Sequence, residues 1–203
     1  MVANPVDILL VLAGYLLGSV SFSHLFALSK GLDLRAIGSG NLGATNAARV
    51  LGTGYGLAIY CLDAAKGAIP VFCASLWMQA AANSWLPVLC GFAAIVGHVW
   101  PIWHRFRGGK GVATLTGAMF VLQPVAALTA AGVAFVVAKL SGFISLASLV
   151  YGIALLIASW FLSDATLPLL SFSGIAMILV FFTHRSNIKR LWGGTESRVG
   201  DSV

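Results

Sequence analysis

Seven apolar stretches separated by short polar loops constrain this chain more than any other feature. They run approximately over residues 6–28, 53–80, 86–103, 112–122, 125–138, 143–162 and 166–183. A helix needs about 20 residues to cross the hydrocarbon core of a bilayer, and five of the seven stretches reach or approach that length. The pattern predicts an all-α, polytopic integral membrane protein.

The two short stretches on either side of Gln123 and Pro124 leave the number of crossings open. They can form two short, tilted helices, which gives about seven transmembrane helices, or one re-entrant hairpin beside five spans. We favour seven helices. The first stretch is too long and too weakly basic at its start for a cleaved signal peptide, so we expect it to be a retained span.

The amino-acid composition agrees with a chain solvated mainly by lipid. Of the 203 residues, 59% are hydrophobic and 9% are charged, and the mean hydropathy is +0.95; soluble domains carry many more charges. The net charge of +6 indicates attraction to anionic headgroups or substrates, and no nucleic-acid partner is expected. Cys61, Cys73 and Cys90 lie in apolar stretches without metal-ligand spacing, so neither a disulfide framework nor a metal site is expected.

The basic residues predict the sidedness of the chain. They concentrate in the loops at about 29–52 and 104–111 and in the tail at 184–203. The positive-inside rule places these segments in the cytoplasm. Seven crossings then put the N-terminus outside and the C-terminus in the cytoplasm, with Lys139 inside and Asp164 outside. Residues 1–203 are expected to form a single membrane-embedded domain.

The first basic loop combines glycines with neutral hydrogen-bonding side chains between Arg35 and Arg49. Its glycines permit close backbone approach and positive φ: Gly38, Gly40 and Gly43. Its polar side chains are Ser39, Asn41, Thr45 and Asn46. Successive amides leading into a helix near Thr45 can bind an anion. A flexible connector capped by Thr45 or Asn46 is the alternative, but the two arginines favour a phosphate site.

The second basic loop places glycines around Lys110 just before an apolar run, as Gly108-Gly109-Lys110-Gly111. Neither Ser nor Thr follows Lys110, so this is not the nucleotide phosphate loop and ATP binding is not implied. At a helix N-terminus Lys110 would add a mobile positive charge. Arg105 can equally be only a topology anchor, and His98 can be a hydrogen-bonded core histidine.

The tail begins with His184 and Asn187, which share one face if the segment is helical. A basic juxtamembrane segment that binds headgroups is the alternative.

Two charges also interrupt the second apolar stretch, at Asp63 and Lys66. A single charge at mid-membrane costs about 2.5 to 3.5 kcal/mol on insertion scales, so this pair should form an ion pair or line a polar cavity.

Four ordered motifs resemble the bacterial acyl-phosphate:glycerol-3-phosphate acyltransferases, membrane enzymes of phospholipid synthesis. They read GSGNLGATNAARVLG at 38–52, DAAKG at 63–67, GHVWPIWHRFRGGKGVAT at 97–114 and HRSNIKRLWGGTE at 184–196, and together they cover nearly the whole chain. The resemblance implies a multi-pass enzyme of the bacterial cytoplasmic (inner) membrane with its active site facing the cytoplasm. It also implies acyl transfer from acyl phosphate to the sn-1 hydroxyl of glycerol 3-phosphate, which gives lysophosphatidate and phosphate. Membrane lipid surrounds such an enzyme, and no cofactor or obligate protein partner is expected.

The chemistry and the resemblance together suggest residue roles. An acyl phosphate already carries a good leaving group, so no acyl-enzyme is needed. The acyl-phosphate candidates are Ser39, Gly40, Asn41, Gly43, Thr45 and Asn46. The glycerol 3-phosphate candidates are Arg49, Lys110, His184 and Asn187. The supporting candidates are Arg35, Asp63, Lys66, His98, Gly108, Gly109 and Glu196. The proton of the attacking hydroxyl can pass to His184 or to a donor phosphate oxygen; the resemblance favours the phosphate, so no catalytic residue is assigned.

Two other classes of protein could use the same basic loops. An anion transporter or channel usually binds near the midplane on broken helices, where this chain places only Asp63 and Lys66. A lipid-binding scaffold would not require Ser39, Asn41 or Asn187, because lysine and arginine would serve. An interfacial enzyme therefore explains more of the sequence.

Overall fold

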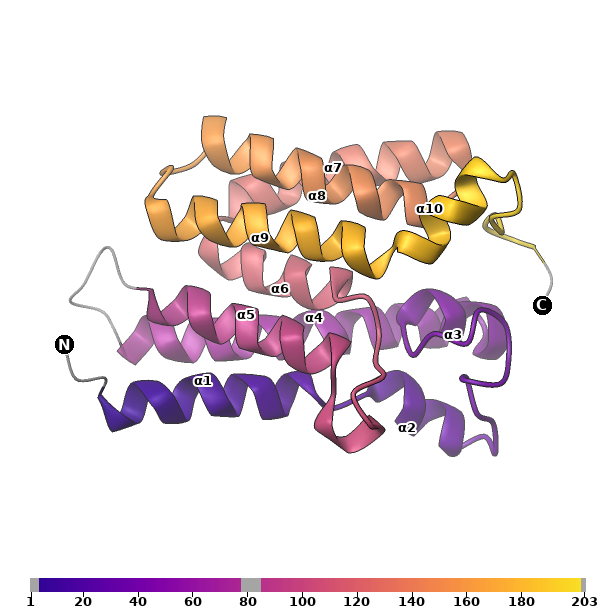
Figure 1. Ribbon diagram of the computed structural model, residues 1–203, viewed down its shortest axis with the longest axis horizontal. Helices are drawn as coiled ribbons and strands as arrows, with labels where there is room; N and C mark the ends of the chain where they lie inside the picture. Colours follow the sequence, from indigo (N-terminus) through magenta and orange to yellow (C-terminus); the bar gives the residue numbers. More distant parts are fainter. Residues whose placement is uncertain (1–3, 78–84, 202–203) are drawn as a thin grey trace.

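The computed structural model describes residues 4–77 and 85–201, and these residues form a bundle of helices without a strand. The helices run largely along one common direction (Figure 1). Their bounds are α1 (Pro5–Gly18), α2 (Phe22–Leu28), α3 (Ala44–Leu51), α4 (Thr53–Trp77), α5 (Leu86–Val99), η1 (Ile102–His104), α6 (Val112–Leu122), α7 (Pro124–Ser141), α8 (Ile144–Phe161), α9 (Leu167–Thr183) and α10 (Arg185–Trp192).

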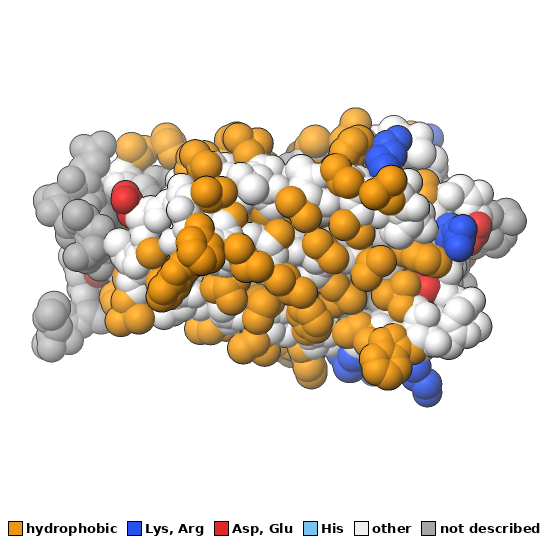
Figure 2. Space-filling model, turned by 90° about the horizontal axis from the view of Figure 1, so that it is seen from above, with side chains coloured by type: hydrophobic (Ala, Val, Ile, Leu, Met, Phe, Trp, Pro, Cys, Tyr) orange, Lys and Arg blue, Asp and Glu red, His pale blue; other side chains and the backbone are white. Residues whose placement is uncertain are grey.

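Five segments are long and apolar enough to cross a membrane: α1 with α2, α4, α5 with η1, α7, and α8. A sixth is formed by α9 and α10, which bend by 59° at their junction, and α6 is a shorter apolar helix. Large apolar side chains such as Leu9, Leu128 and Ile178 are exposed on these helices. On the face seen in Figure 2, hydrophobic side chains are spread over the middle of the molecule, and the charged side chains lie toward its ends. The predicted all-α polytopic membrane fold is confirmed.

The structure favours seven helices over five spans with a hairpin. The α7 helix extends over 18 residues, beyond the predicted stretch at 125–138, and is long enough to cross. Figure 1 shows α6 and α7 running in opposite directions, with α7 returning to the end of the bundle that carries α10. Helix α1 begins at the opposite end, as an odd number of crossings requires.

The first apolar stretch is one span but two helices. Ser19 donates its hydroxyl to the carbonyl of Tyr15 at 2.8 Å, and the hydroxyl of Ser21 accepts from the His24 N–H at the start of α2. Serine side chains that bond the nearby backbone compete with a continuous helix. The break between α1 and α2 leaves the Val20 carbonyl outside both helices, which matters for the buried charges described below.

Glycines let neighbouring helix backbones approach closely in the centre of the bundle. A Cβ on Gly117 of α6 would lie 1.8 Å from the carbonyl oxygen of Ala64 on α4, and one on Gly67 would lie 2.0 Å from that of Thr114. Small residues drive helix packing in membranes because lipid supplies no hydrophobic force between helices. This contact fixes α6, whose N-terminus follows Lys110.

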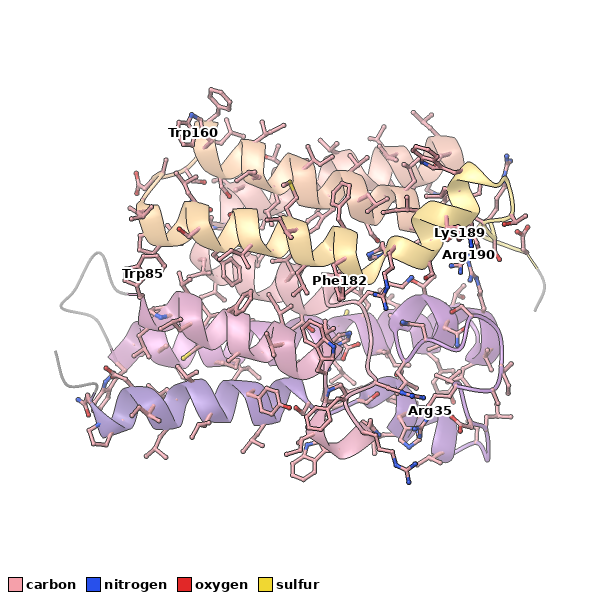
Figure 3. The ribbon with its side chains drawn as sticks, viewed as in Figure 1. Arg35, Trp85, Trp160, Phe182, Lys189 and Arg190 are labelled. Atoms are coloured by element: carbon pink, nitrogen blue, oxygen red, sulfur yellow. The ribbon has the colours of Figure 1, made fainter. Side chains whose placement is uncertain are left out.

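The basic side chains gather at one end of the bundle, which we call the loop end. It carries residues 29–43, residues 105–111, the turn between α7 and α8, and the tail at 193–201 (Figure 1). Arg35, Lys189 and Arg190 lie there, whereas Trp85 and Trp160 lie at the opposite end (Figure 3). The clustering of the basic loops agrees with the predicted sidedness; which end faces the cytoplasm stays a prediction.

Candidate functional site

The second basic loop and the tail, two of the three segments singled out in the sequence, meet directly at the loop end. The hydroxyl of Thr183, at the end of α9, donates to the Lys110 carbonyl at 3.1 Å. The Lys110 ammonium donates to the side-chain oxygen of Asn187. Arg49 of α3 donates to the carbonyl of Ser197 in the tail at 3.3 Å. The contacts join residues up to 148 positions apart, so the second loop, α3 and the tail lie together.

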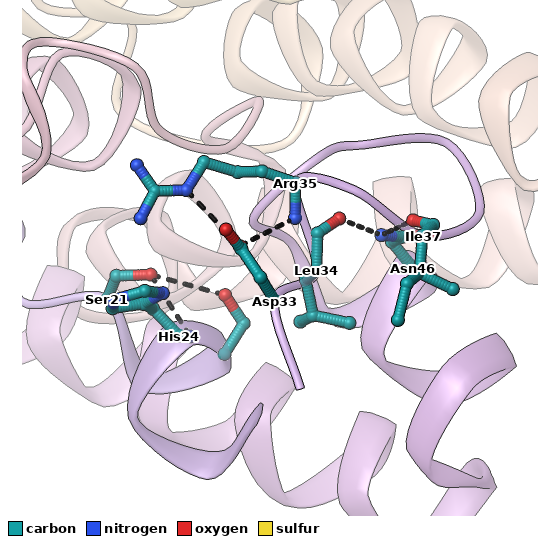
Figure 4. A network of polar contacts seen from close by, with 8 residues as sticks. Ser21, His24, Asp33, Leu34, Arg35, Ile37 and Asn46 are labelled. Carbon is teal, nitrogen blue, oxygen red and sulfur yellow. Dashed lines mark hydrogen bonds and ion pairs between the residues drawn. The ribbon is translucent and has the colours of Figure 1, made fainter. Parts of the chain in front are cut away.

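Asn46 holds the first loop in shape. Its amide nitrogen donates to the carbonyls of Leu34 and Ile37, each at 3.1 Å, and its oxygen accepts from the Ser39 N–H at 2.9 Å. The side chain is 2% exposed, and Figure 4 shows it aimed at the backbone of the loop. Both amide protons are used within the loop, so Asn46 shapes the loop in this structure; its direct contact with acyl phosphate stays a prediction.

The glycines of the first loop explain how α3 begins. Gly38 and Gly40 have φ of +65° and +70°, the positive values expected for a tight turn. Gly43, with φ of −126°, is the residue before α3, and no side chain caps the helix. The alternative considered from the sequence, a connector capped by Thr45 or Asn46, therefore does not describe this helix start. The uncapped first turn presents N–H groups suited to an anion.

The remaining side chains of the first loop differ in accessibility. Ser39, Gly40 and Thr45 are exposed, and Asn41 is partly buried. Arg35 forms an exposed ion pair with Asp33, Nε to Oδ1, at 3.3 Å (Figure 4). An exposed pair of this kind contributes little to stability. The structure gives Arg35 no contact with Lys110 or Asn187 among the described residues.

The glycines before Lys110 pack against the end of α5. The N–H of Gly108 donates to the Val99 carbonyl, and that of Gly109 donates to the His98 carbonyl, each at 3.1 Å. A Cβ on Gly108 would lie 2.0 Å from the His98 oxygen. These two glycines are thus required by protein packing, a reason that spacing alone did not reveal.

Lys110 and Asn187 belong to a partly buried chain of polar side chains. The amide nitrogen of Asn187 donates to Glu196 Oε1 at 2.6 Å, and Arg190 Nε donates to Oε2 at 2.7 Å. Burial raises the pKa of Glu196, but hydrogen bonds from neighbouring side chains outweigh burial and lower that pKa overall. Glu196 is therefore ionised and orients Asn187 toward Lys110. The sequence predicted Glu196 as a supporting residue, but it did not predict the hydrogen bonds of Glu196 with Asn187 and Arg190.

His184 lies at the junction of α9 and α10 and is buried. Its Nδ1 lies 2.8 Å from the Val180 carbonyl oxygen. A carbonyl can only accept, so Nδ1 carries the proton and Nε2 of the neutral ring is an acceptor. A substrate hydroxyl that donates to Nε2 would be oriented by it.

The tail adds contacts that the sequence analysis did not find. The Val199 N–H donates to the Gly142 carbonyl at 2.8 Å, and the Arg198 guanidinium lies 5.1 Å from the centre of the Phe143 ring. With the contact between Arg49 and Ser197, these interactions lay the tail across α3 and the turn between α7 and α8. No periodicity or motif in the sequence predicts that the tail lies across these elements.

A separate cavity of about 370 Å³ lies near the start of α5 and the start of α9, lined by Trp85, Thr166, Leu167 and Pro168. Trp85 lies far from the loop end (Figure 3). The cavity carries no charged side chain, so we do not assign it to the polar site.

The partly buried position of Lys110 predicts a pH dependence of anion binding. Burial is the largest influence and lowers the pKa of Lys110 to about 8. The ammonium therefore loses its proton as the pH rises through about 8. An anionic ligand binds the cation, so above that pH its affinity should fall by about tenfold per pH unit until the pKa of the bound state is reached. The Kd for glycerol 3-phosphate, the substrate that the resemblance implies, measured between pH 7 and 10, tests this prediction.

Lys110→Arg is the matched variant, because its guanidinium stays charged throughout this range. It should bind with a much flatter pH profile. Equal slopes in the two proteins would show that another group titrates.

Comparisons with known proteins agree with this architecture. The family described as "Glycerol-3-phosphate acyltransferase" matches residues 8–194. Glycerol-3-phosphate acyltransferases from Halalkalibacterium halodurans and Myxococcus xanthus are each 43% identical, the first over 95% of both chains and the second over 93% of this chain and 97% of the relative. The crystal structure of PlsY, an integral membrane glycerol 3-phosphate acyltransferase, in its glycerol 3-phosphate form matches 96% of both chains with a TM-score of 0.92 and 37% identity. Its lysophosphatidic acid form matches with a TM-score of 0.89 and 36% identity.

Proposed function

This chain belongs to the glycerol-3-phosphate acyltransferase family, and we propose that its acyl donor is an acyl phosphate. It is a multi-pass membrane enzyme of phospholipid synthesis. The proposed reaction moves a fatty acyl group to the sn-1 hydroxyl of glycerol 3-phosphate and gives lysophosphatidate and inorganic phosphate. The main support from this chain is the contact of Lys110 with Asn187, which joins two phosphate-binding motifs into one cationic site.

Glycerol 3-phosphate is assigned to Lys110, Arg49, His184 and Asn187. Lys110 has three ammonium protons, of which Asn187 accepts one, so others can meet a phosphate. Arg49 donates one hydrogen bond to the Ser197 carbonyl, and its other N–H groups can donate to the phosphate. A hydrogen bond to a charged group contributes about 1.5 to 3 kcal/mol, enough for two cations and an amide to select a phosphate-bearing alcohol.

The acyl phosphate is assigned to the turn at Gly38–Gly43 and the first turn of α3. Ser39 and Thr45 are exposed there, and the uncapped N–H groups of α3 favour a phosphate or a developing oxyanion. Asn41 and Gly40 complete the turn, and Asn46 acts by keeping it in shape.

The reaction then needs positioning more than a nucleophilic side chain. The sn-1 oxygen attacks the acyl carbonyl carbon, and the bond from that carbon to the phosphate oxygen breaks. The hydroxyl proton leaves with the phosphate, so atoms and charge balance without an acyl-enzyme. His184, with Nε2 as an acceptor, orients the hydroxyl. Holding two reactants in line can contribute about 7 to 11 kcal/mol to lowering the barrier.

The membrane location follows from the acyl chain. Each methylene moved from lipid to water costs about 0.8 kcal/mol, so extracting a long chain would cost on the order of 10 kcal/mol. A polar site at the end of a lipid-embedded bundle avoids that cost. We assign this end to the cytoplasmic face of the bacterial inner membrane; the support is the positive-inside rule applied to the basic loops.

The donor is tested with purified protein in detergent, glycerol 3-phosphate, and either palmitoyl phosphate or palmitoyl-CoA. Lysophosphatidate and free phosphate should form only with palmitoyl phosphate. Product from palmitoyl-CoA alone would overturn the donor assignment. Folded protein that makes no product from either donor would refute acyl transfer and would direct attention to anion flux in liposomes.

Asn187→Ala separates an enzyme from a lipid-binding scaffold. The change removes the partner of both Lys110 and Glu196, so the KM for glycerol 3-phosphate should rise about tenfold or more, as loss of a charged hydrogen bond predicts. Initial rates at saturating palmitoyl phosphate measure it. Ser186→Ala is the neighbouring control, because Ser186 is exposed, and should match the wild type. An unchanged KM in folded Asn187→Ala would contradict the assignment.

A further inference from the structure

Three polar residues are buried in the bundle beneath the second loop: Asp63 and Lys66 of α4, and His98 of α5. Each is at most 7% exposed. Lys66 Nζ lies 2.7 Å from Asp63 Oδ1, which confirms the expected ion pair, and His98 Nδ1 lies 3.7 Å from the same oxygen. Buried ion pairs often add little net stability because desolvation offsets attraction. Stability alone is therefore a weak reason for this cluster.

One side of the cluster holds the break between α1 and α2. Lys66 Nζ donates to the Val20 carbonyl at 2.7 Å. That carbonyl lies between the end of α1 at Gly18 and the start of α2 at Phe22, where the helical hydrogen-bond pattern is interrupted. Lys66 thus anchors the helix that leads into the first loop.

The other side of the cluster supports the second loop. The His98 carbonyl accepts from the Gly109 N–H at 3.1 Å. A Cβ on Gly109 would lie 2.1 Å from His98 Nε2 and 2.8 Å from Cε1, so the imidazole ring forms the surface on which Gly109 rests. The next residue along the chain is Lys110, whose ammonium meets Asn187.

We infer that His98, held beside Asp63 and Lys66, is a positioning residue that sets where Gly109 lies and thereby where Lys110 meets glycerol 3-phosphate. This inference rests on the proposed binding role of Lys110. Asp63 Oδ1 lies 3.7 Å from Nδ1 on one edge of the His98 ring, and the Nε2 edge of the ring lies against Gly109. The cluster touches no substrate in this scheme; it links the α1–α2 break to the phosphate-binding lysine.

The first test perturbs the contact from the loop side. Gly109→Ala places a methyl group against the ring, so the KM for glycerol 3-phosphate should rise about tenfold or more, since small displacements at a site carry large kinetic costs. The KM for palmitoyl phosphate should change less than about twofold, within the scatter of independent sites. His98→Ala removes the imidazole ring that the new methyl group at position 109 would meet.

The double variant decides whether the two changes act on one contact. With both changes, the KM for glycerol 3-phosphate should not exceed that of Gly109→Ala alone, because neighbours that share a contact are not additive. A KM equal to the product of the two single effects would overturn the inference.

Two replacements of His98 separate positioning from a role in stability. His98→Asn keeps a side-chain amide that can face Asp63 and should keep the KM for glycerol 3-phosphate within about threefold of the wild type, whereas His98→Leu should raise it about tenfold. A role in stability alone would lower Tm and leave the KM of the folded fraction unchanged. Wild-type KM values in both His98→Leu and Gly109→Ala would refute positioning.

The two proposals fail in different ways. Every variant is compared with wild-type protein that already forms lysophosphatidate, so an inactive wild type would refute the acyl-transfer reading before the His98 comparison begins. If His98→Leu does not fold, Gly109→Ala decides by itself: a wild-type KM for glycerol 3-phosphate overturns the inference.

Discussion

Lys110→Ala should lower kcat/KM for glycerol 3-phosphate by about 10- to 150-fold, the effect of losing one charged hydrogen bond of about 1.5 to 3 kcal/mol. The ammonium follows the glycines that rest on α5 and meets Asn187. Its removal deletes a cation at the start of α6 and leaves the bundle's apolar contacts in place. Lysophosphatidate formation by purified protein, with glycerol 3-phosphate varied at saturating palmitoyl phosphate, measures the loss.

Lys139→Ala is the control for charge at the same end of the molecule. Lys139 is exposed in the last turn of α7 and lies 5.6 Å from the centre of the Phe135 ring. The Lys139→Ala variant should retain the wild-type kcat/KM. If the basic end attracted anions only nonspecifically, Lys139→Ala and Lys110→Ala would lower kcat/KM to a similar extent. Wild-type efficiency in folded Lys110→Ala would remove Lys110 from the site.

Gly117→Ala should destabilise the folded protein by about 1 to 3 kcal/mol, the usual range for overpacking. A Cβ at this position would lie 1.8 Å from the Ala64 carbonyl oxygen. The obstacle is backbone on α4, which cannot rotate away as a flexible side chain can. Thermal unfolding in one detergent, followed by loss of soluble monodisperse protein, should show a lower Tm. Activity should also fall, since α6 carries Lys110 at its N-terminal side.

Gly132→Ala is the matched glycine replacement. Gly132 lies in α7, and a Cβ there would meet nothing within 4 Å. The same chemical change should leave Tm unchanged or slightly higher, because alanine is the better helix former. Equal Tm values for the two variants would show that the contact between α4 and α6 is not tightly packed.

Local sequence was a good guide where a residue's environment follows from its own neighbours along the chain. The expected helices appear in the structure, and the basic loops lie at one end of the bundle. The positive φ of Gly38 and Gly40 also appears. Asn46 was predicted from its polarity to contact a ligand, whereas in the structure its amide donates to the carbonyls of Leu34 and Ile37, 12 and 9 residues away. Polarity alone cannot tell a side chain that binds a ligand from one that binds its own loop.

The sequence by itself determined that lipid surrounds most of the chain, that the fold is a bundle of helices, and that the loops suit phosphate groups. Long apolar stretches cannot remain in water, backbone groups in lipid must be satisfied within helices, and clustered Gly, Arg and Lys suit phosphate. Only the tertiary structure decided that Lys66 supports the break between α1 and α2, that the His98 ring supports Gly109, and that Glu196 orients Asn187. These contacts join segments distant in the chain, and their geometry depends on how whole helices pack against one another.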